Sequence, residues 1–76
     1  MTATLSELID IAYRVKVFLS LGSYELHQYE DGSFVDFHVK KITDINGLLK
    51  AASGLEVRFF AEENFITIRL FEKDCY

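Results

Sequence analysis

The chain has little cysteine, no glycine-rich stretch and no long apolar run, and each absence excludes a class of protein. Its single cysteine, Cys75, allows no intrachain disulfide and favours a reducing compartment. The four glycines stand singly, so no phosphate-binding loop is expected. Polar and charged residues interrupt every apolar stretch before it reaches the ~18 residues that a membrane-spanning helix requires. We therefore expect no membrane partner.

The sequence is also poor in basic charge. Eight Lys and Arg residues stand against twelve Asp and Glu residues, which gives a net charge of −4. Because DNA-backbone binding depends on clustered cations that neutralise phosphates, this balance argues against a nucleic-acid partner. The first residues include Glu7 and Asp10 and contain no basic segment before an apolar run, so we expect no secretory signal. A cytoplasmic protein is the expectation.

The 76 residues fit a single domain, residues 1–76, with one hydrophobic core. Half of the residues are hydrophobic and 14% are aromatic, which is enough to fold without a disulfide or metal. Chains of this length bury only about 60% of their unfolded surface, so little core remains to support a deep catalytic cleft. We expect neither an enzyme nor a cofactor, and no residue is assigned a catalytic role.

Residues 5–21 have the pattern of an amphipathic helix. The segment from Thr4 to Glu7 matches a capping box, and Gly22 stands where a left-handed C-terminal cap is expected. Apolar residues recur at spacings of three and four. The predicted buried stripe is Leu5, Leu8, Ile9, Ala12, Val15 and Leu19, with Ile11 and Phe18 on its flank.

The next segment alternates apolar with polar residues, which is typical of strands that are buried on one face. It predicts strands 23–30 and 33–41, joined by a two-residue loop of Asp31 and Gly32. Alternation assigns Leu26 and its apolar neighbours to the core face. The loop predicts the cross-strand pairs Leu26 with Phe37, His27 with Asp36, and Glu25 with His38.

The second half of the chain has a similar order of elements. Thr43 or Asp44 caps a shorter predicted helix that ends near Gly54, and strands 55–61 and 65–72 follow it. A four-residue loop joins these strands. Asn64 is expected to take a left-handed conformation in this loop, which would pair Phe60 with Phe65.

These elements predict an α+β domain of order αββαββ. Two helix-hairpin units form a four-stranded antiparallel sheet with both helices on one face. The units, residues 5–41 and 44–72, align without a gap at an offset of 31 residues, which raises the possibility of an internal repeat. Alternation alone would align two such hairpins equally well, so duplication and chance both stay open. The strand order is not predicted.

A cluster of histidines and carboxylates lies on the predicted outer face of the first hairpin. His27, His38, Glu25 and Asp36 could supply nitrogen and oxygen ligands to Zn²⁺ from one rigid surface. A ladder of cross-strand charge pairs is the alternative. The second hairpin has arginines in place of both histidines, which favours the ladder. We therefore assign no metal site.

Aromatic and arginine side chains gather on the same outer face. Monomers seldom expose such a patch, and aromatic and arginine residues are enriched where proteins bind one another. Stacking of single-stranded nucleic acid is an alternative use, which the surrounding carboxylates disfavour. Another alternative is that Phe60, Phe65 and Phe71 fold over the sheet edge and complete the core. The predicted partner-binding residues on this face are Tyr29, Phe34, Arg58, Phe60, Phe65 and Arg69.

A second candidate patch lies on the first helix. Tyr13, Val17 and Leu21 are spaced by four residues and stand roughly opposite the core stripe. A partner site would explain them, and so would burial by the second helix and the 41–45 connection.

The sequence as a whole favours a small, non-enzymatic protein–protein interaction module. We expect its partner to be a second copy, bound through the aromatic sheet face. The alternative is a small acidic inhibitor or nucleic-acid mimic, of the kind that mobile elements encode, bound to a nucleic-acid-handling enzyme. Size, charge and the lack of a recognisable site are the observations in favour of that alternative.

Overall fold

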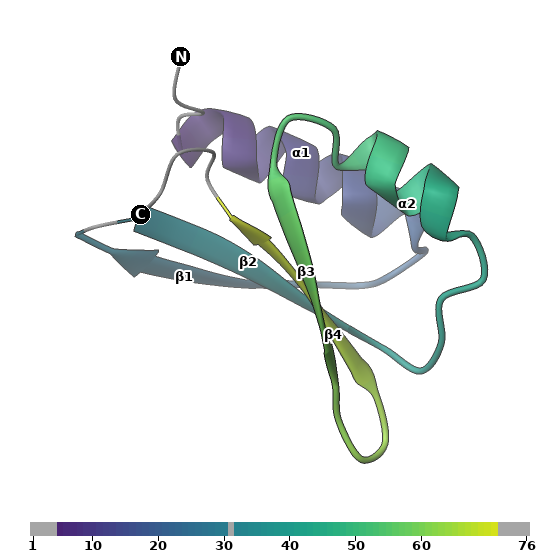
Figure 1. The fold of residues 1–76 in the computed structure, drawn as a ribbon. Helices are drawn as coiled ribbons and strands as arrows, with labels where there is room; N and C mark the ends of the chain where they lie inside the picture. Colours follow the sequence, from purple (N-terminus) through teal and green to yellow (C-terminus); the bar gives the residue numbers. More distant parts are fainter. Residues whose placement is uncertain (1–4, 31, 72–76) are drawn as a thin grey trace.

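The computed structural model describes residues 5–30 and 32–71 (Figure 1). Thr4, Asp31 and Cys75, which the sequence analysis used, lie outside these residues. The prediction of an α+β domain with two helices and a four-stranded antiparallel sheet is confirmed. Along the chain the elements are α1 (Leu5–Phe18), β1 (Glu25–Tyr29), β2 (Gly32–Val39), α2 (Ile45–Ala51), β3 (Glu56–Ala61) and β4 (Ile66–Phe71).

The strands lie in the order β1-β2-β4-β3, and each pairs antiparallel with its neighbours. The two hairpins therefore join through their second strands, which leaves β1 and β3 at the edges. At the centre of the sheet Phe37 pairs with Ile68, two residues that the 31-residue offset also aligns. Internal duplication stays a hypothesis.

The core lies between the helices and the central strands. Figure 1 shows α1 crossing the sheet with α2 beside it, and α1 contacts α2 and the two central strands, β2 and β4. The edge strands are covered less, so that Leu26 on β1 and Phe59 on β3 are exposed although both were predicted on the core face. The largest fully buried side chains are Phe37, Leu8, Leu48, Ile68, Leu70, Val15 and Val35.

The buried stripe of α1 differs from the predicted one by a rotation of the helix. Ile9 is exposed, whereas Ile11, which was predicted on the flank, is buried. The stripe that results has spacings of three, four and seven residues. Its members are Leu8, Ile11, Ala12 and Val15.

The end of α1 also differs from the prediction, because the helix stops at Phe18 and Gly22 is not its cap. Ser20 has a φ of 57° and its N–H donates to the carbonyl of Val17 at 3.1 Å. The N–H of Leu21 donates to the carbonyl of Lys16 at 3.0 Å. These two bonds are those of a Schellman motif, with Ser20 in the position that glycine usually occupies.

Replacing Ser20 with glycine is expected to raise the free energy of unfolding by about 0.5–1 kcal/mol, because glycine takes a positive φ without strain from a Cβ. Urea denaturation followed by circular dichroism measures this change. Gly22→Ala is the matched control: Gly22 has no positive φ and a Cβ there meets open space, so we expect no loss of stability. Destabilisation by Ser20→Gly would contradict the assignment of the cap.

Both hairpins keep the predicted faces but are shifted by two residues in register. In the first hairpin Tyr29 pairs with Gly32, whereas the predicted loop would pair Glu30 with Ser33. Gly32 still supplies a positive φ, of 144°, but as the first residue of β2. The observed cross-strand pairs replace the predicted ones: Leu26 with Val35, His27 with Phe34, and Glu25 with Asp36.

In the second hairpin the loop is residues 62–65. The N–H of Glu62 donates to the carbonyl of Phe65 at 2.9 Å. Phe60 therefore pairs with Thr67 and not with Phe65. Among the residues that the structure describes, Ser20 is the sole non-glycine residue with a positive φ, so the left-handed Asn64 was wrong.

The start of α2 resolves the choice between Thr43 and Asp44 as its cap. Asp44 is the N-cap, and its Oδ1 accepts from the N–H of Gly47 at 2.9 Å. A Cβ on Gly47 would lie 2.5 Å from Asp44 Oδ2 and 2.7 Å from the ring of Phe18. A side chain at position 47 would thus have to displace the capping carboxylate of Asp44 and the ring of Phe18, a cost that offsets the low helix propensity of glycine.

Candidate functional site

The sheet face opposite to the one on which α1 packs carries aromatic and charged side chains from all four strands. Antiparallel pairing arranges them in rows across the sheet, and one row is Glu25, Asp36, Arg69 and Arg58. The next row is His27, Phe34, Phe71 and Glu56. We call this surface the open face, and it comprises these eight residues with Tyr29, His38, Phe60, Phe65 and Thr67.

Arg69 lies at the centre of the open face and has three partners there, one carboxylate and two aromatic rings. Its Nε donates to Asp36 Oδ1 at 2.7 Å, and its Nη2 donates to Asp36 Oδ2 at 3.0 Å. Its guanidinium carbon lies 4.3 Å from the ring centre of Phe34 and 4.9 Å from that of Phe60. The guanidinium is therefore fixed by a bidentate ion pair and two cation–π contacts.

The ion pair also affects titration and burial. The side-chain hydrogen bonds to Asp36 raise the pKa of Arg69 above its ordinary value, and they outweigh the opposing effect of partial burial. Arg69 therefore keeps its positive charge. Asp36 is only 5% exposed although its strand position points it away from the core. The open face thus buries one of its own carboxylates beneath its larger side chains.

Aromatic stacking extends the cluster toward the edge of the sheet. The rings of His27 and Tyr29 stack on Phe34, with ring centres 4.7 and 5.7 Å away. Phe71 lies tilted against Phe34 at 5.7 Å, and the guanidinium carbon of Arg58 lies 5.2 Å from the ring centre of Phe71. Five of the six predicted binding residues on this face therefore form one contiguous cluster: Tyr29, Phe34, Arg58, Phe60 and Arg69.

The sixth, Phe65, lies in the β3–β4 loop and packs edge-on against the ring of His38, with 5.1 Å between ring centres. Phe60 and Phe65 are both exposed, and neither they nor Phe71 belongs to the buried core or packs against it. The alternative that Phe60, Phe65 and Phe71 complete the core was therefore wrong. Tyr29 is the most exposed aromatic residue of the open face, at 59%.

The histidines connect neighbouring strands. His38 Nε2 lies 3.3 Å from Glu25 Oε2, and His38 Nδ1 lies 3.1 Å from Thr67 Oγ1. With its proton on Nε2, His38 donates to Glu25 and accepts from the buried Thr67 hydroxyl. The sequence-based pairing of His38 directly opposite Glu25 was wrong, yet the diagonal contact brings the two together.

Three potential metal ligands converge on this face. Donor atoms of Glu25, His27 and Asp36 lie within 4.8 Å of one another. His27 Nε2 is 3.8 Å from both carboxylates and has no hydrogen-bond partner among the residues that the structure describes. Both oxygens of Asp36 already accept hydrogen bonds from Arg69, however, and a cation here would lie beside that guanidinium.

We expect Zn²⁺ to bind weakly or not at all, because the ion would have to compete with Arg69 for Asp36 and would be repelled by its charge. Isothermal titration calorimetry with a zinc salt measures the affinity directly. Sub-micromolar binding that disappears in His27→Ala would contradict this prediction and make the cluster a metal site.

The patch predicted on α1 is only partly present. Tyr13 and Val17 are exposed on the helix surface, and Lys16 Nζ lies 5.1 Å from the ring centre of Tyr13. Leu21 lies beyond the end of α1 and packs against the core cluster, so it does not continue the patch. The predicted spacing required a helix that reached residue 21.

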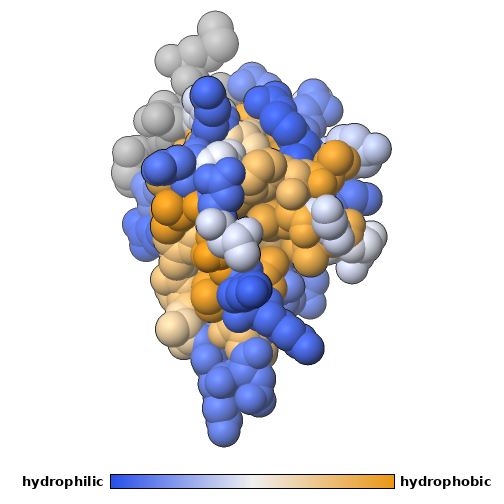
Figure 2. Space-filling view, turned by 90° about the vertical axis from the view of Figure 1, so that its right-hand side faces the viewer, coloured by the Kyte–Doolittle hydropathy of each residue, from blue (hydrophilic) through white to orange (hydrophobic). Residues whose placement is uncertain are grey.

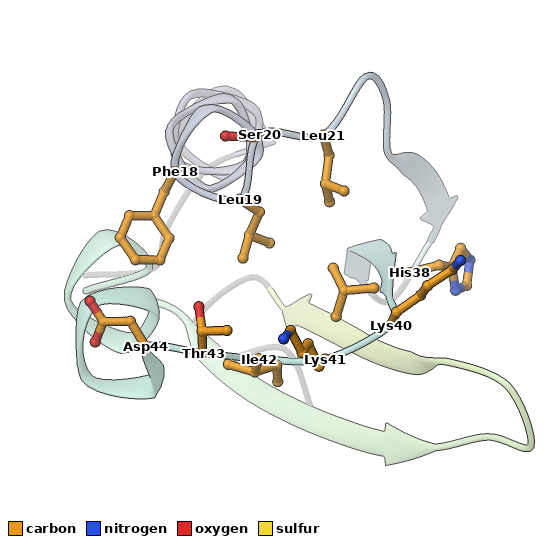
Figure 3. A pocket seen from close by; sticks show the side chains of 11 residues that line it. Phe18, Leu19, Ser20, Leu21, His38, Lys40, Lys41, Ile42, Thr43 and Asp44 are labelled. Atoms are coloured by element: carbon orange, nitrogen blue, oxygen red, sulfur yellow. The ribbon is translucent and has the colours of Figure 1, made fainter.

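A pocket that the sequence did not predict lies between the end of α1 and the β2–α2 connection. Its volume is about 500 Å³. Figure 3 shows Leu19 and Leu21 pointing toward the connection that carries Lys40, Lys41 and Ile42. Figure 2, seen from the side where α2 and this connection lie in Figure 1, shows hydrophobic residues gathered with hydrophilic residues around them. No motif in the sequence marks these residues, because a loop and a helix end bring them together.

No family model, curated protein or solved structure matches this chain. Within residues 5–30 and 32–71, no helix is long and apolar enough to cross a membrane. Function must therefore be inferred from the geometry of the surfaces. The open face offers exposed aromatic rings and charges fixed by ion pairs.

Proposed function

We propose that the protein is a small, non-enzymatic protein–protein interaction module that self-associates through the open face. The observation that carries the proposal is the contiguous cluster of exposed aromatic rings around Arg69. Aromatic and arginine side chains dominate the binding energy of protein interfaces when they are packed together. Rings and a guanidinium that are already held in place lose little conformational entropy on binding.

The charges of the open face favour a protein over a nucleic acid. Asp36 satisfies Arg69, and Glu56 Oε2 accepts from Arg58 Nε at 2.6 Å. The carboxylate of Glu25 adds a further negative charge on the same surface. Phosphate groups would therefore meet compensated arginines and repelling carboxylates.

The arrangement of the layers supports a role in binding without catalysis. Because α1 packs on the other face of the sheet, a substrate bound to the exposed rings of the open face would stay in water. A general acid or base works best in a site that is closed to solvent. A second protein surface would supply the missing layer.

Light scattering coupled to size-exclusion chromatography tests self-association. A face about 20 Å across would bury on the order of 1,000 Å² in a dimer, which is the low end for specific interfaces. We therefore expect a dimer that forms in the micromolar range. A protein that stays monomeric at high micromolar concentration would overturn the proposal.

Point variants test which surface is used. Phe60→Ser and Phe65→Ser remove exposed rings from the open face and are expected to shift the protein to monomer. Tyr13→Ser is the matched control, because it removes an exposed ring from α1. If Tyr13→Ser dissociates the dimer and the two phenylalanine variants do not, the interface lies on α1 instead.

A further inference from the structure

The charged row of the open face has an ordered sequence of signs. Across the sheet from β1 to β3, its residues are Glu25, Asp36, Arg69 and Arg58. The two acids lie on one side of the line between β2 and β4, and the two cations lie on the other. The row is therefore antisymmetric in charge about the middle of the sheet.

An antisymmetric row is complementary to a copy of itself. Consider a twofold axis that runs above the open face, parallel to the strands and midway between β2 and β4. Rotation about it places a second copy face to face with the first. The strand order of the second copy is then reversed, while each row stays opposite the same row of the other copy. Such an axis places Glu25 opposite Arg58 of a second copy, and Asp36 opposite its Arg69. We infer that the partner of the open face is a second copy of the chain in this orientation, an inference that rests on the proposed function.

The neighbouring row fits the same axis. It reads His27, Phe34, Phe71 and Glu56 from β1 to β3. Reversal places His27 opposite Glu56 of the second copy, which allows a hydrogen bond or an ion pair. It also places Phe34 opposite Phe71 of the second copy, so that rings meet rings in the middle of the interface.

The other simple twofold axis is unfavourable for the charged row of Glu25, Asp36, Arg69 and Arg58. An axis perpendicular to the strands and lying along the row would set each strand against its own copy. Glu25 would then face Glu25, and Arg58 would face Arg58, which are repulsive contacts. The signs of the four charges therefore select the axis that is parallel to the strands.

The outer pair of the row has the reach that this dimer requires. The side chain of Glu25 is 58% exposed and that of Arg58 is 61% exposed. Aligned sheets pack about 10 Å apart, a gap that these two long side chains can span together. Asp36 is held in a bidentate, partly buried pair with Arg69 of its own chain. Glu25 and Arg58 have only exposed partners, His38 and Glu56, which they can exchange for one another across the interface, so the Glu25–Arg58 contacts decide the orientation.

Charge reversal tests the inference. Glu25→Arg and Arg58→Glu each create two like-charge contacts in the symmetric dimer. Each variant is therefore expected to raise the dissociation constant of the dimer by about tenfold or more. Sedimentation equilibrium measures this change. Both positions are exposed, so the substitutions should leave the fold intact, which circular dichroism verifies. Asp10→Arg and Arg14→Glu make the same charge changes on exposed positions of α1 and are expected to leave dimerisation unchanged.

Mixing the two variants provides the decisive measurement. In a heterodimer of Glu25→Arg with Arg58→Glu, each of the two contacts has opposite charges again, with the signs exchanged at one of them. We expect the equimolar mixture to dimerise within about threefold of wild type although neither variant does so alone. The double variant, which carries both changes, should likewise dimerise.

The possible failures are distinguishable. A wild-type dimer that Phe60→Ser dissociates, but that both charge reversals leave intact, would overturn this orientation and keep the proposed function. Variants that dissociate but do not recombine would also overturn the Glu25–Arg58 contact. A wild-type monomer at high micromolar concentration would overturn both the orientation and the proposed function.

Discussion

Phe37→Ala is expected to lower the free energy of unfolding by about 3–5 kcal/mol, the usual cost of removing a fully buried phenylalanine side chain. Phe37 has 0% exposure, pairs with Ile68 at the centre of the sheet and lies with its ring centre 5.5 Å from that of Tyr24. A chain of 76 residues has about 4–11 kcal/mol of stability in total. The variant should therefore be largely unfolded or close to it, which thermal and urea denaturation followed by circular dichroism will show.

Phe59→Ala provides the control for this prediction. Phe59 points to the same face of the sheet as Phe37, but it lies on the edge strand β3 and is 39% exposed. Its removal should cost about 1 kcal/mol, because more than a third of the residue is already in water and less apolar surface is lost than at a fully buried phenylalanine. Equal losses in the two variants would show that the core does not lie over the centre of the sheet.

Asp36→Ala is expected to cost about 2–3 kcal/mol, the next largest effect. The substitution removes both acceptors of the Arg69 guanidinium, which then lies between Phe34 and Phe60 without a compensating carboxylate. The sequence pattern predicts Asp36 on the outer face of the sheet, where the loss of an exposed carboxylate usually costs little. The structure changes that expectation, because the Asp36 side chain is buried and accepts two hydrogen bonds from Arg69.

A second substitution separates the ion pair from the packing. Arg69→Met in the Asp36→Ala background removes the unpaired charge and keeps an apolar chain between the rings, so part of the lost stability should return. Urea denaturation of both variants measures this recovery. Glu25→Ala, at the exposed neighbouring position of the row, should cost less than about 0.5 kcal/mol. A double variant no more stable than Asp36→Ala would contradict the role assigned to the unpaired guanidinium.

The faces of the strands could be predicted from the sequence, but the register could not. Alternation assigns Phe37 to the core and Phe34 to the outer face, and a shift of two residues leaves both assignments unchanged. The two registers differ in their loop and in their cross-strand pairs, which alternation does not rank. Gly32 was expected to be the second residue of the loop. It does have a positive φ, but it is the first residue of β2.

The end of α1 shows a different limit. The preference for glycine at a left-handed position pointed to Gly22, yet the motif forms at Ser20. The position of the cap is set by where the chain must leave the helix to reach the sheet. That requirement comes from tertiary packing and outweighs a local preference of about 1 kcal/mol.

The membership of the open face could be predicted, but its contacts could not. Sequence patterning placed Arg69 and Phe60 on the outer face, because that assignment requires alternation alone. The burial of Asp36 depends on Arg69, which lies 33 residues further along the chain. The strand order that brings β2 beside β4 was not predicted, and without it neither this pair nor the charged row could be derived.

The β2–β4 pairing, the central seam that joins the two hairpins, has a consequence for the folding pathway. Each hairpin pairs two strands that are neighbours in the sequence, whereas the pairing of β2 with β4 joins segments separated by all of α2 and β3. Such non-local pairing pays a loop-closure entropy and is usually slow. We expect the transition state for folding to contain this central seam, so that substitutions at Phe37 and Ile68 slow folding while those in the hairpin loops mainly speed unfolding.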